Sequence, residues 1–392
     1  MDTASTPRNL FVCCDGTNNQ FGAENTNVVR FVQILDRDPA AQQLICYDPG
    51  VGTLPPPTVW SWVGQKASVL AGLAFGAGIA RNLAETYSFL MEQHRPGDRI
   101  FLLGFSRGAY TARALAGLLH HLGLLRAGSQ NLVPYAIRLF RQINELRPGT
   151  PAANAYWRTC EEFRKTFARV DPSGPVPTTR CRTHFVGVWD TVSSVGWIWT
   201  PQRFPFTASN PGVAIFRHAV ALDERRCFFR QNLWRRHADA PAQDISELWF
   251  PGVHSDVGGG YPERSGGLWR APFLWMVREA GRAGARLDER RLGRVLARTP
   301  VPLPSWADRA HESLTPGWWP AELFPKFPRG WWPEFGLGRR RKVPAGALFH
   351  HTLLRRLRRS ELGYRPRNVA ARFVARLAAT PVLPFASPYR PD

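Results

Sequence analysis

Cysteine is scarce in this chain, and its few occurrences are not arranged to bind a metal or to form a disulfide framework. The six cysteines are spread thinly, with no Cys-x-x-Cys pair and no histidines at zinc-finger spacing. Cys13, Cys14 and Cys46 lie in apolar runs, where a free cysteine usually behaves as a small buried hydrophobe. We therefore expect folding in a reducing compartment, with neither a structural metal nor another cofactor.

Long hydrophobic runs are also missing. The longest one, residues 69–80, is shorter than the roughly 20 apolar residues that span a bilayer. The N-terminal segment MDTASTPRNLFVCC lacks the basic stretch followed by an apolar stretch that forms a secretion signal. We expect a protein that is soluble and cytoplasmic when made, and whose export, if it occurs, does not use such a signal.

Acidic residues are outnumbered by arginine. The chain has 51 Lys plus Arg, nearly all of them Arg, against 30 Asp plus Glu, which gives a net charge of +21. Such a surface attracts polyanions, including anionic lipid headgroups and acidic partner proteins, although an Arg-rich coding bias produces the same charge without a partner. Because no nucleic-acid-binding motif is recognisable, we expect no nucleic acid partner.

Apolar runs of strand length alternate with segments of helical character. We predict strands at residues 10–14, 43–47, 99–104, 184–189 and 246–250, the last being the final recognisable strand. Helices are expected at residues 26–35, 66–94, 107–124, 133–146, 153–168 and 272–280. This alternation predicts an α/β fold with a mostly parallel central sheet flanked by helices.

Changes in composition predict how the chain is organised. We assign residues 1–302 to one catalytic domain, within which residues 126–180 form a helical insertion that resembles a cap. Residues 303–392 form a C-terminal extension rich in Trp, Pro and Arg, with little periodicity in its first half. We expect this extension to be irregular and to pack on the catalytic domain.

A G-x-S-x-G motif, Gly104-Phe105-Ser106-Arg107-Gly108, lies directly after a strong strand and before a helix. This is the context of a nucleophile elbow, in which a serine hydroxyl stands exposed on a tight strand-to-helix turn. The flanking glycines leave room for that turn, and the following helix directs the positive end of its dipole at a developing oxyanion. The pattern therefore predicts Ser106 as a nucleophile in a fold of the α/β-hydrolase type.

A serine nucleophile needs a histidine base and a carboxylate that orients the base. In α/β-hydrolases these residues follow the serine in the order Asp, then His. Asp190 ends the strand HFVGVW, and His254 lies just after the strand SELWF. We predict that both lie at the same edge of the sheet as Ser106.

Other histidines compete for the role of the base. His350 and His351 lie far downstream beside basic residues and remain an alternative to His254. His120 and His121 fall on the helix after the elbow, and His218 is followed by sequence of helical character. These three are expected to be structural.

An oxyanion hole requires two backbone N–H groups. We expect one from Arg107, the residue after the nucleophile, and the other from the turn after the first strand, at Gly16 and Thr17. Asp15 and Asp256 are expected to support the site. Asp15 has no second carboxylate at metal-ligand spacing, and Asp256 is typical of a residue that caps a loop.

At these positions the chain resembles a family of uncharacterised α/β-hydrolase domains that includes the type VI secretion phospholipase effectors of bacteria. A further block, FHHTLL with YRP at residues 364–366, also looks familial. The main matching blocks cover residues from about 9 to 285 and are CDGT at 14–17, GFSRGAYTARALAG at 104–117, VGVWDTV at 186–192, RHAVALDERR at 217–226 and WFPGVHSDVGGGY at 249–261.

The resemblance implies a Ser106, Asp190 and His254 triad and, in the effector branch, phospholipid esters as substrates. We expect a serine hydrolase of carboxylic esters, with lipids as its substrates and a peripheral contact with anionic membranes. The alternatives are a catalytically silent binding module on the same scaffold and an esterase acting on a small soluble ester. The sequence identifies no immunity or secretion partner.

Overall fold

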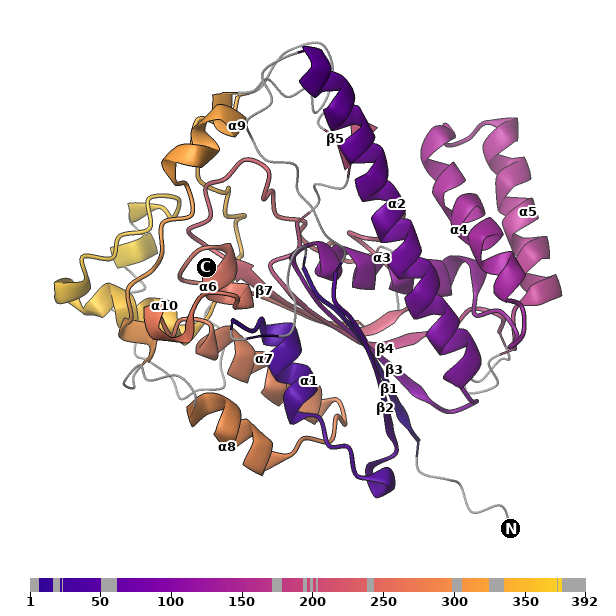
Figure 1. Ribbon diagram of the computed structural model, residues 1–392, viewed down its shortest axis with the longest axis horizontal. Coiled ribbons are helices and arrows are strands. Elements are labelled where there is room, and N and C mark those ends of the chain that lie inside the picture. Colours follow the sequence, from indigo (N-terminus) through magenta and orange to yellow (C-terminus); the bar gives the residue numbers. More distant parts are fainter. Residues whose placement is uncertain are drawn as a thin grey trace.

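A parallel β-sheet runs through the centre of the molecule (Figure 1). The computed structural model describes residues 7–16, 22, 24–50, 62–170, 178–192, 196–197, 200–201, 204–237, 243–297, 305–323, 335–371 and 373–375, with the backbone alone for 62–77, 196–197 and 200–201. The main sheet has seven strands in the order β2-β1-β3-β4-β7-β8-β9, and each of its pairings is parallel. Its strands are β1 (Asn9–Cys14), β2 (Gln43–Asp48), β3 (Arg99–Phe105), β4 (Thr183–Trp189), β7 (Val213–Ala221), β8 (Asp244–Phe250) and β9 (Leu348–Phe349).

Helices cover both faces of this sheet (Figure 1). A separate antiparallel pair is formed by β5 (Gly196–Trp197) and β6 (Thr200–Pro201). The helices are α1 (Asn27–Ile34), α2 (Trp62–Gln93), α3 (Ser106–Leu122), α4 (Val133–Gln142), α5 (Pro151–Phe167), α6 (His254–Gly258), α7 (Arg270–Arg282), α8 (Glu289–Ala297), α9 (Trp319–Leu323) and α10 (His351–Arg358).

Strand β1 is apolar from Leu10 to Cys14 because both sides of the sheet are buried there. In β1, Leu10 and Val12 pack with the side chains of α2 and α3, whereas Phe11 and Cys13 pack with those of α1 and α7. Residues of a strand alternate between its two faces, so an unbroken apolar run is the pattern of a sheet covered twice. The predicted α/β fold, with a parallel sheet flanked by helices, is confirmed.

Two strands differ from the sequence prediction. The segment around His218 is the central strand β7 and not the start of a helix, because Arg217 and His218 find buried partners inside the fold. The prediction that residues 246–250 form the last strand is also wrong, since β9 pairs with β8 farther along the chain. Residues 254–258, where no helix was predicted, form the short helix α6.

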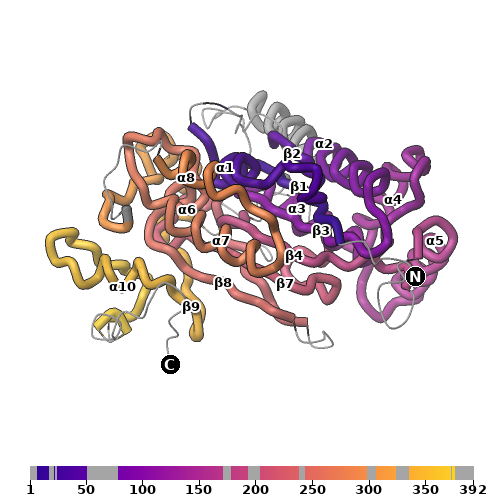
Figure 2. The backbone as a smooth tube through the Cα atoms, turned by 90° about the horizontal axis from the view of Figure 1, so that it is seen from below, coloured from indigo at the N-terminus to yellow at the C-terminus, as the bar shows by residue number. Residues whose placement is uncertain are grey.

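The insertion and the C-terminal extension lie at opposite ends of the molecule (Figure 2). In the insertion, α4 and α5 pack against α3, and their contacts include the last turn of that helix, where His121 bonds Tyr156. The nucleophile candidate Ser106 begins the same helix at its other end. A cap over the site stays a prediction. Within the described residues, no helix has the length and apolar character needed to cross a bilayer.

Candidate active site

The turn from β3 into α3 is the tight bend expected for a nucleophile elbow. Ser106 has a φ of 57°, in the left-handed region that residues other than glycine seldom adopt. A Cβ atom on Gly104 would lie 2.6 Å from backbone atoms of Gly108 and Ala109. One on Gly108 would collide with the carbonyl oxygens of Cys14 and Asp15. Both glycines are therefore required by the close approach of β1, β3 and α3.

Three side chains from separate strands meet at the carboxyl edge of the sheet. Ser106 follows β3, Asp190 follows β4, and His254 follows β8 as the first residue of α6. In parallel sheets the carboxyl ends of strands share one edge, which explains why residues so distant in sequence lie together. Asp190 also has a positive φ, 40°, at the bend where its strand ends.

These three side chains form a continuous hydrogen-bonded chain. His254 Nε2 lies 2.8 Å from Ser106 Oγ, and His254 Nδ1 lies 2.5 Å from Asp190 Oδ2. All three residues are buried, with Asp190 fully inaccessible and Ser106 8% exposed. The structure thus brings together the serine, the imidazole and the carboxylate that the sequence nominated.

The electrostatics of the site fix the direction of these bonds. Burial alone would raise the pKa of the Asp190 carboxyl, but the charge of Arg341 and the His254 hydrogen bond hold that pKa well below its usual range. Burial lowers the pKa of His254, and the opposing pull of Asp190 does not fully restore it. Since Asp190 is ionised and His254 is neutral, Nδ1–H donates to the carboxylate and Nε2 accepts from the serine hydroxyl.

Two aromatic rings hold the imidazole of His254 in place. Its centroid lies 4.6 Å from that of Phe105 and 4.7 Å from that of Phe229, the latter in an edge-on contact. A Cβ atom on Gly258 would collide with the Phe105 ring. Gly258 therefore makes room for the ring that packs against His254.

Glu224 fixes the backbone of the histidine loop and was not identified from the sequence. Its side chain is fully buried and accepts the His254 N–H at 3.1 Å through Oε2. Arg226 and Ser313 also donate to this carboxylate. The sequence pointed to Glu224 only through the familial block RHAVALDERR, which contains it. No role for this carboxylate was evident from the sequence.

Arg341 is a second residue of the site that sequence reasoning missed. Its guanidinium donates to both oxygens of Asp190, with Nη1 2.5 Å from Oδ1 and Nη2 3.0 Å from Oδ2. The residue is buried, although it belongs to the run Arg339-Arg340-Arg341-Lys342. Such a run is typical of a solvated charged surface, so nothing in its composition singles out the one arginine that turns inward.

The residues predicted for an oxyanion hole lie beside the elbow, but they are not equally available. The Arg107 N–H belongs to the first turn of α3, where backbone donors have no partner within the helix. Burial lowers the pKa of the Arg107 side chain to about 9. The Gly16 N–H donates to Asp15 Oδ1 at 2.7 Å in this conformation. Thr17 lies outside the described residues.

The two supporting aspartates have distinct structural roles. Asp15 is buried and accepts hydrogen bonds from Thr26 at 2.7 Å and Tyr47 at 3.0 Å, which ties the turn after β1 to α1 and β2. Asp256 accepts the Val253 N–H at 3.0 Å and therefore caps α6, as expected for a loop-capping residue. It also accepts from His311 Nδ1 at 2.6 Å, a contact with the extension.

The competing histidines have other partners. His350 caps the N-terminus of helix α10, forms a hydrogen bond with Thr352 and stacks on Phe250. His218 accepts the Thr191 N–H at Nε2 and donates from Nδ1 to Glu247. The histidine that the structure joins to Ser106 is His254. The role of each as a base stays a prediction.

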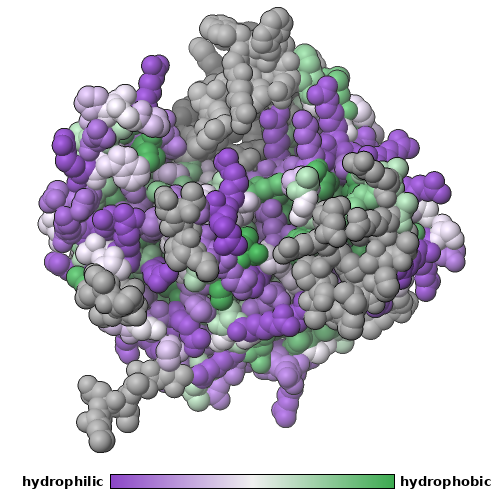
Figure 3. Space-filling view, turned by 180° about the vertical axis from the view of Figure 1, so that it is seen from behind, coloured by the Kyte–Doolittle hydropathy of each residue, from purple (hydrophilic) through white to green (hydrophobic). Residues whose placement is uncertain are grey.

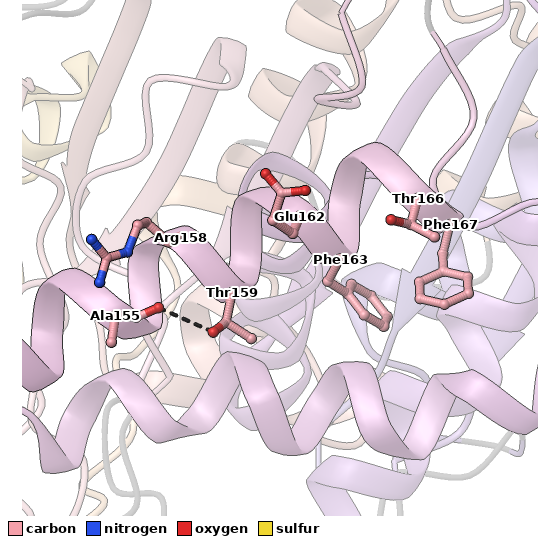
Figure 4. Close-up of a pocket in the computed structure, with 7 residues that line it drawn as sticks. All are labelled: Ala155, Arg158, Thr159, Glu162, Phe163, Thr166 and Phe167. Carbon is pink, nitrogen blue, oxygen red and sulfur yellow. Dashed lines mark hydrogen bonds between the residues drawn. The ribbon is translucent and has the colours of Figure 1, made fainter.

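A shallow surface pocket on α5, lined by residues such as Arg158, Glu162 and Phe163, contains none of the predicted site residues (Figure 4). The described residues contain no cluster of three or more His, Cys, Asp or Glu that could hold a metal ion.

Comparisons with known proteins agree with the resemblance of the sequence blocks. Residues 8–279 match the family described as the Tle1-like catalytic domain of type VI secretion phospholipase effectors. An uncharacterized protein of the yeast Saccharomyces cerevisiae is 34% identical over 240 residues, which are 58% of this chain and 33% of the yeast protein. The chain thus spans about a third of that relative's length.

One solved structure, an uncharacterized protein from Pseudomonas aeruginosa, is similar to this chain at 19% sequence identity with a TM-score of 0.44. The similarity covers 81% of this chain and 51% of that protein. The chain therefore corresponds to about half of the Pseudomonas protein.

Proposed function

The chain belongs to the Tle1-like catalytic-domain family of type VI secretion phospholipase effectors, and we propose that it is a serine hydrolase of lipid esters. Ser106 is the nucleophile, His254 is the general base and acid, and Asp190 orients the imidazole. The observation that carries this proposal is the unbroken chain from Ser106 Oγ through His254 to Asp190. The left-handed φ of Ser106 supports it, because strain of this kind clusters at functional sites.

The geometry supports an acyl-enzyme mechanism of the α/β-hydrolase type. His254 Nε2 takes the proton of Ser106 while Oγ attacks the ester carbonyl carbon, and the resulting oxyanion is stabilised by the Arg107 N–H. His254 then gives that proton to the alcohol oxygen as the ester bond breaks. Water attacks the acyl-enzyme, loses a proton to His254 and releases the carboxylic acid, and the proton returns to Ser106.

A second backbone donor is required for full stabilisation of the oxyanion. We propose Gly16, whose N–H would have to leave Asp15 Oδ1 when substrate binds. The carbonyl groups of Cys14 and Asp15 pack against Gly108 of α3, which places the Asp15–Gly16 peptide beside the elbow. Thr17 is retained in the proposal as the adjacent donor.

Labelling and lipid analysis test this function directly. The wild-type protein is expected to react with a fluorophosphonate at Ser106 and to release fatty acid from phospholipid vesicles. Ser106→Ala should abolish both, whereas Ser129→Ala, in a turn beyond the far end of α3, should leave them unchanged. Turnover of a short soluble ester without turnover of vesicles would favour a small-molecule esterase. A protein that neither labels nor turns over any ester would be a silent binding module.

A further inference from the structure

The carboxylate of Asp190 is saturated by four hydrogen bonds. Oδ1 accepts from the Ala221 N–H at 2.9 Å and from Arg341 Nη1 at 2.5 Å, while Oδ2 accepts from Arg341 Nη2 at 3.0 Å and from His254 Nδ1 at 2.5 Å. An ionised carboxyl offers about four acceptor positions, so none is left for a rotated arrangement. Two of the four donors come from one residue of the C-terminal extension.

We propose that Arg341 is a positioning residue of the active site, and that the extension therefore completes the catalytic machinery. This inference rests on the proposed function of Ser106, His254 and Asp190. Arg341 lies outside residues 8–279, which carry the family match. Its role is to hold the Asp190 carboxylate in the plane that receives the imidazole of His254.

The guanidinium of Arg341 is held on both sides. Besides Asp190, Nη1 donates to the Ala221 carbonyl at 2.9 Å and Nη2 to the Phe229 carbonyl at 2.6 Å. A planar fork that meets a carboxylate through two parallel bonds fixes orientation as well as charge. Lysine has one point charge and cannot reproduce this geometry.

The backbone that carries Arg341 is anchored to the same part of the fold. Asn368 Nδ2 donates to the Leu222 carbonyl at 2.9 Å and to the Arg341 carbonyl at 3.2 Å, so it joins the end of β7 to the arginine. The Lys342 carbonyl accepts from Gln231 Nε2 at 3.1 Å. The side chain thus enters the site from a fixed origin.

The extension also reaches the histidine side of the site. His311 bonds Asp256 within α6, and Ser313 Oγ donates to Glu224, which in turn accepts the His254 N–H. Arg341 contacts the acid, Asp190, whereas His311 and Ser313 support the backbone that carries the base, His254. Because the acid and the base follow different strands, one segment that contacts both fixes the distance between them.

Arg341 has a second consequence for catalysis through charge. Its cation offsets the anion of Asp190, so the pull of Asp190 on the imidazolium form of His254 is weaker than that of an isolated carboxylate. The charged groups that act on His254 are Asp190, Glu224 and Arg226, and the charge of Arg341 acts in turn on Asp190 and Glu224. Removal of Arg341 is therefore expected to favour protonated His254 and to move the acid limb of the rate profile to higher pH.

The test compares Arg341→Met, which keeps the bulk, and Arg341→Lys, which keeps the charge, with Arg339→Met as a matched control in an exposed position of the same run. We expect kcat for Arg341→Met to fall by about 10- to 100-fold, the range typical of residues that orient a catalytic ligand, with little change in KM. Arg341→Lys should recover part of this loss. Guanidinium ion added to Arg341→Ala should restore part of the activity.

A role in folding alone would not produce these results. Thermal denaturation first establishes that Arg341→Met is folded. If the folded variant retains the wild-type kcat and the wild-type pH profile, the inference is overturned. The inference is also overturned if guanidinium leaves the activity of Arg341→Ala unchanged and Arg339→Met loses as much activity as Arg341→Met.

An observation that does not need turnover separates this inference from the proposed function. The His254 Nδ1–H bonded to Asp190 gives a low-field proton resonance, which Arg341→Met should shift or broaden and Arg339→Met should not. If the wild type lacks Ser106-dependent hydrolysis but shows this response, the proposed function fails while the contact of Arg341 with the acid–base pair stands. If hydrolysis is present and the resonance is insensitive to Arg341, only the inference fails.

Discussion

Two residues of the candidate site, Ser106 and Asp190, have backbone conformations that most side chains avoid. Their φ values are 57° and 40°, and each lies where a strand ends. A conformation of this kind costs of order 1–3 kcal/mol and persists only when its surroundings impose it. For Ser106 the surroundings are Gly104 and Gly108, which allow α3 to start against the ends of β1 and β3.

Gly108→Ala is expected to disrupt this bend. The added methyl group would collide with the Cys14 and Asp15 carbonyls, both of which belong to rigid backbone. Overpacking of this kind costs about 1–3 kcal/mol, and the displaced elbow should lose fluorophosphonate labelling. Urea unfolding measures the first effect. Gly293→Ala, in an exposed turn of α8 with open space around it, should instead stabilise the protein by about 0.5–1 kcal/mol.

The pH dependence of kcat/KM should report His254. The residue accepts the Ser106 proton only when neutral, so activity is lost as pH falls through its pKa. Burial lowers the pKa of His254 from the ordinary histidine value of 6.5, which predicts an acid limb centred below that value. Steady-state hydrolysis of a soluble ester, with unfolding followed over the same range, makes the measurement. An acid limb centred above 6.5 would contradict the assignment.

The residues of the site that follow from a motif or from strand order could be predicted from the sequence, and the residue supplied by the extension could not. Ser106 was identified because strand, turn glycines and helix are adjacent along the chain. Asp190 and His254 followed from the rule that parallel strands end at one edge. Arg341, 151 residues from Asp190, was missed because it follows no predicted strand and belongs to a run of basic residues that resembles an exposed surface.

At the scale of whole elements, β7 was the strand that the sequence concealed. Its segment VAIFRHAVA includes Arg217 and His218, which do not belong to an apolar run. In the fold, Arg217 bonds Glu279 at 2.7 Å and Asp244 at 2.5 Å, and His218 bonds Glu247 at 2.8 Å. Buried charges are tolerated when such partners exist, and partners from other elements leave no trace in the local pattern. Strands that are apolar after their first residue, such as β1 and β3, were predicted within a residue of their ends.

The turn after β7 connects this strand to the histidine loop through Glu224. We expect Glu224→Gln to destabilise the protein by about 3 kcal/mol, as when one partner of a buried ion pair is removed. Catalytic activity should also fall, because the His254 backbone loses its fixed acceptor. Glu312→Gln, which removes an exposed pairing with Arg225, should change stability by less than about 1 kcal/mol.

The same variant has a defined pH signature. Burial would raise the pKa of Glu224, but its bonds with Arg226 lower it to about 2, below the ordinary value of 4.5. A depressed folded pKa contributes stability that is fully present above the unfolded value and is lost as pH falls through the folded value. The difference between wild type and Glu224→Gln should therefore shrink from pH 4.5 to pH 2. Urea unfolding across this window measures it, and a constant difference would contradict the prediction.

At the scale of the whole molecule, the extension is integrated into the sheet at the end opposite the insertion (Figure 2). β9 pairs with β8, and Phe349, Leu353 and Leu354 pack against Val220 and Trp249. A two-residue strand has too little sequence to be recognised, which explains why the extension was expected to be irregular. Together with Arg341, these contacts make the candidate active site depend on the C-terminal extension as well as on the strands that precede it.

Helix α9 of the extension carries exposed apolar side chains and follows a tryptophan that packs near the candidate active site. Trp319 is 41% exposed and Leu323 is 51% exposed, and the neighbouring Trp318 ring packs on Phe229, which contacts His254. On the face of the molecule shown in Figure 3, hydrophilic residues predominate and apolar ones form separate patches. Because Trp favours the membrane interface and arginine is attracted to acidic headgroups, we propose that α9 contacts the surface of an anionic bilayer.

Vesicle binding tests this contact. Replacing Trp319 and Leu323 with serine should weaken binding to vesicles of anionic phospholipid by at least roughly tenfold, because full burial of one apolar side chain contributes about 1.5–3 kcal/mol and about 1.4 kcal/mol corresponds to a factor of ten. Trp157→Ser is the matched control, since Trp157 is 44% exposed and lies on α5, at the other end of the molecule (Figure 2). Binding of the wild type should also fall as salt rises, because screening weakens the attraction between arginine and headgroups. If neutral vesicles bind equally well and salt has no effect, the net charge of +21 has no part in membrane contact.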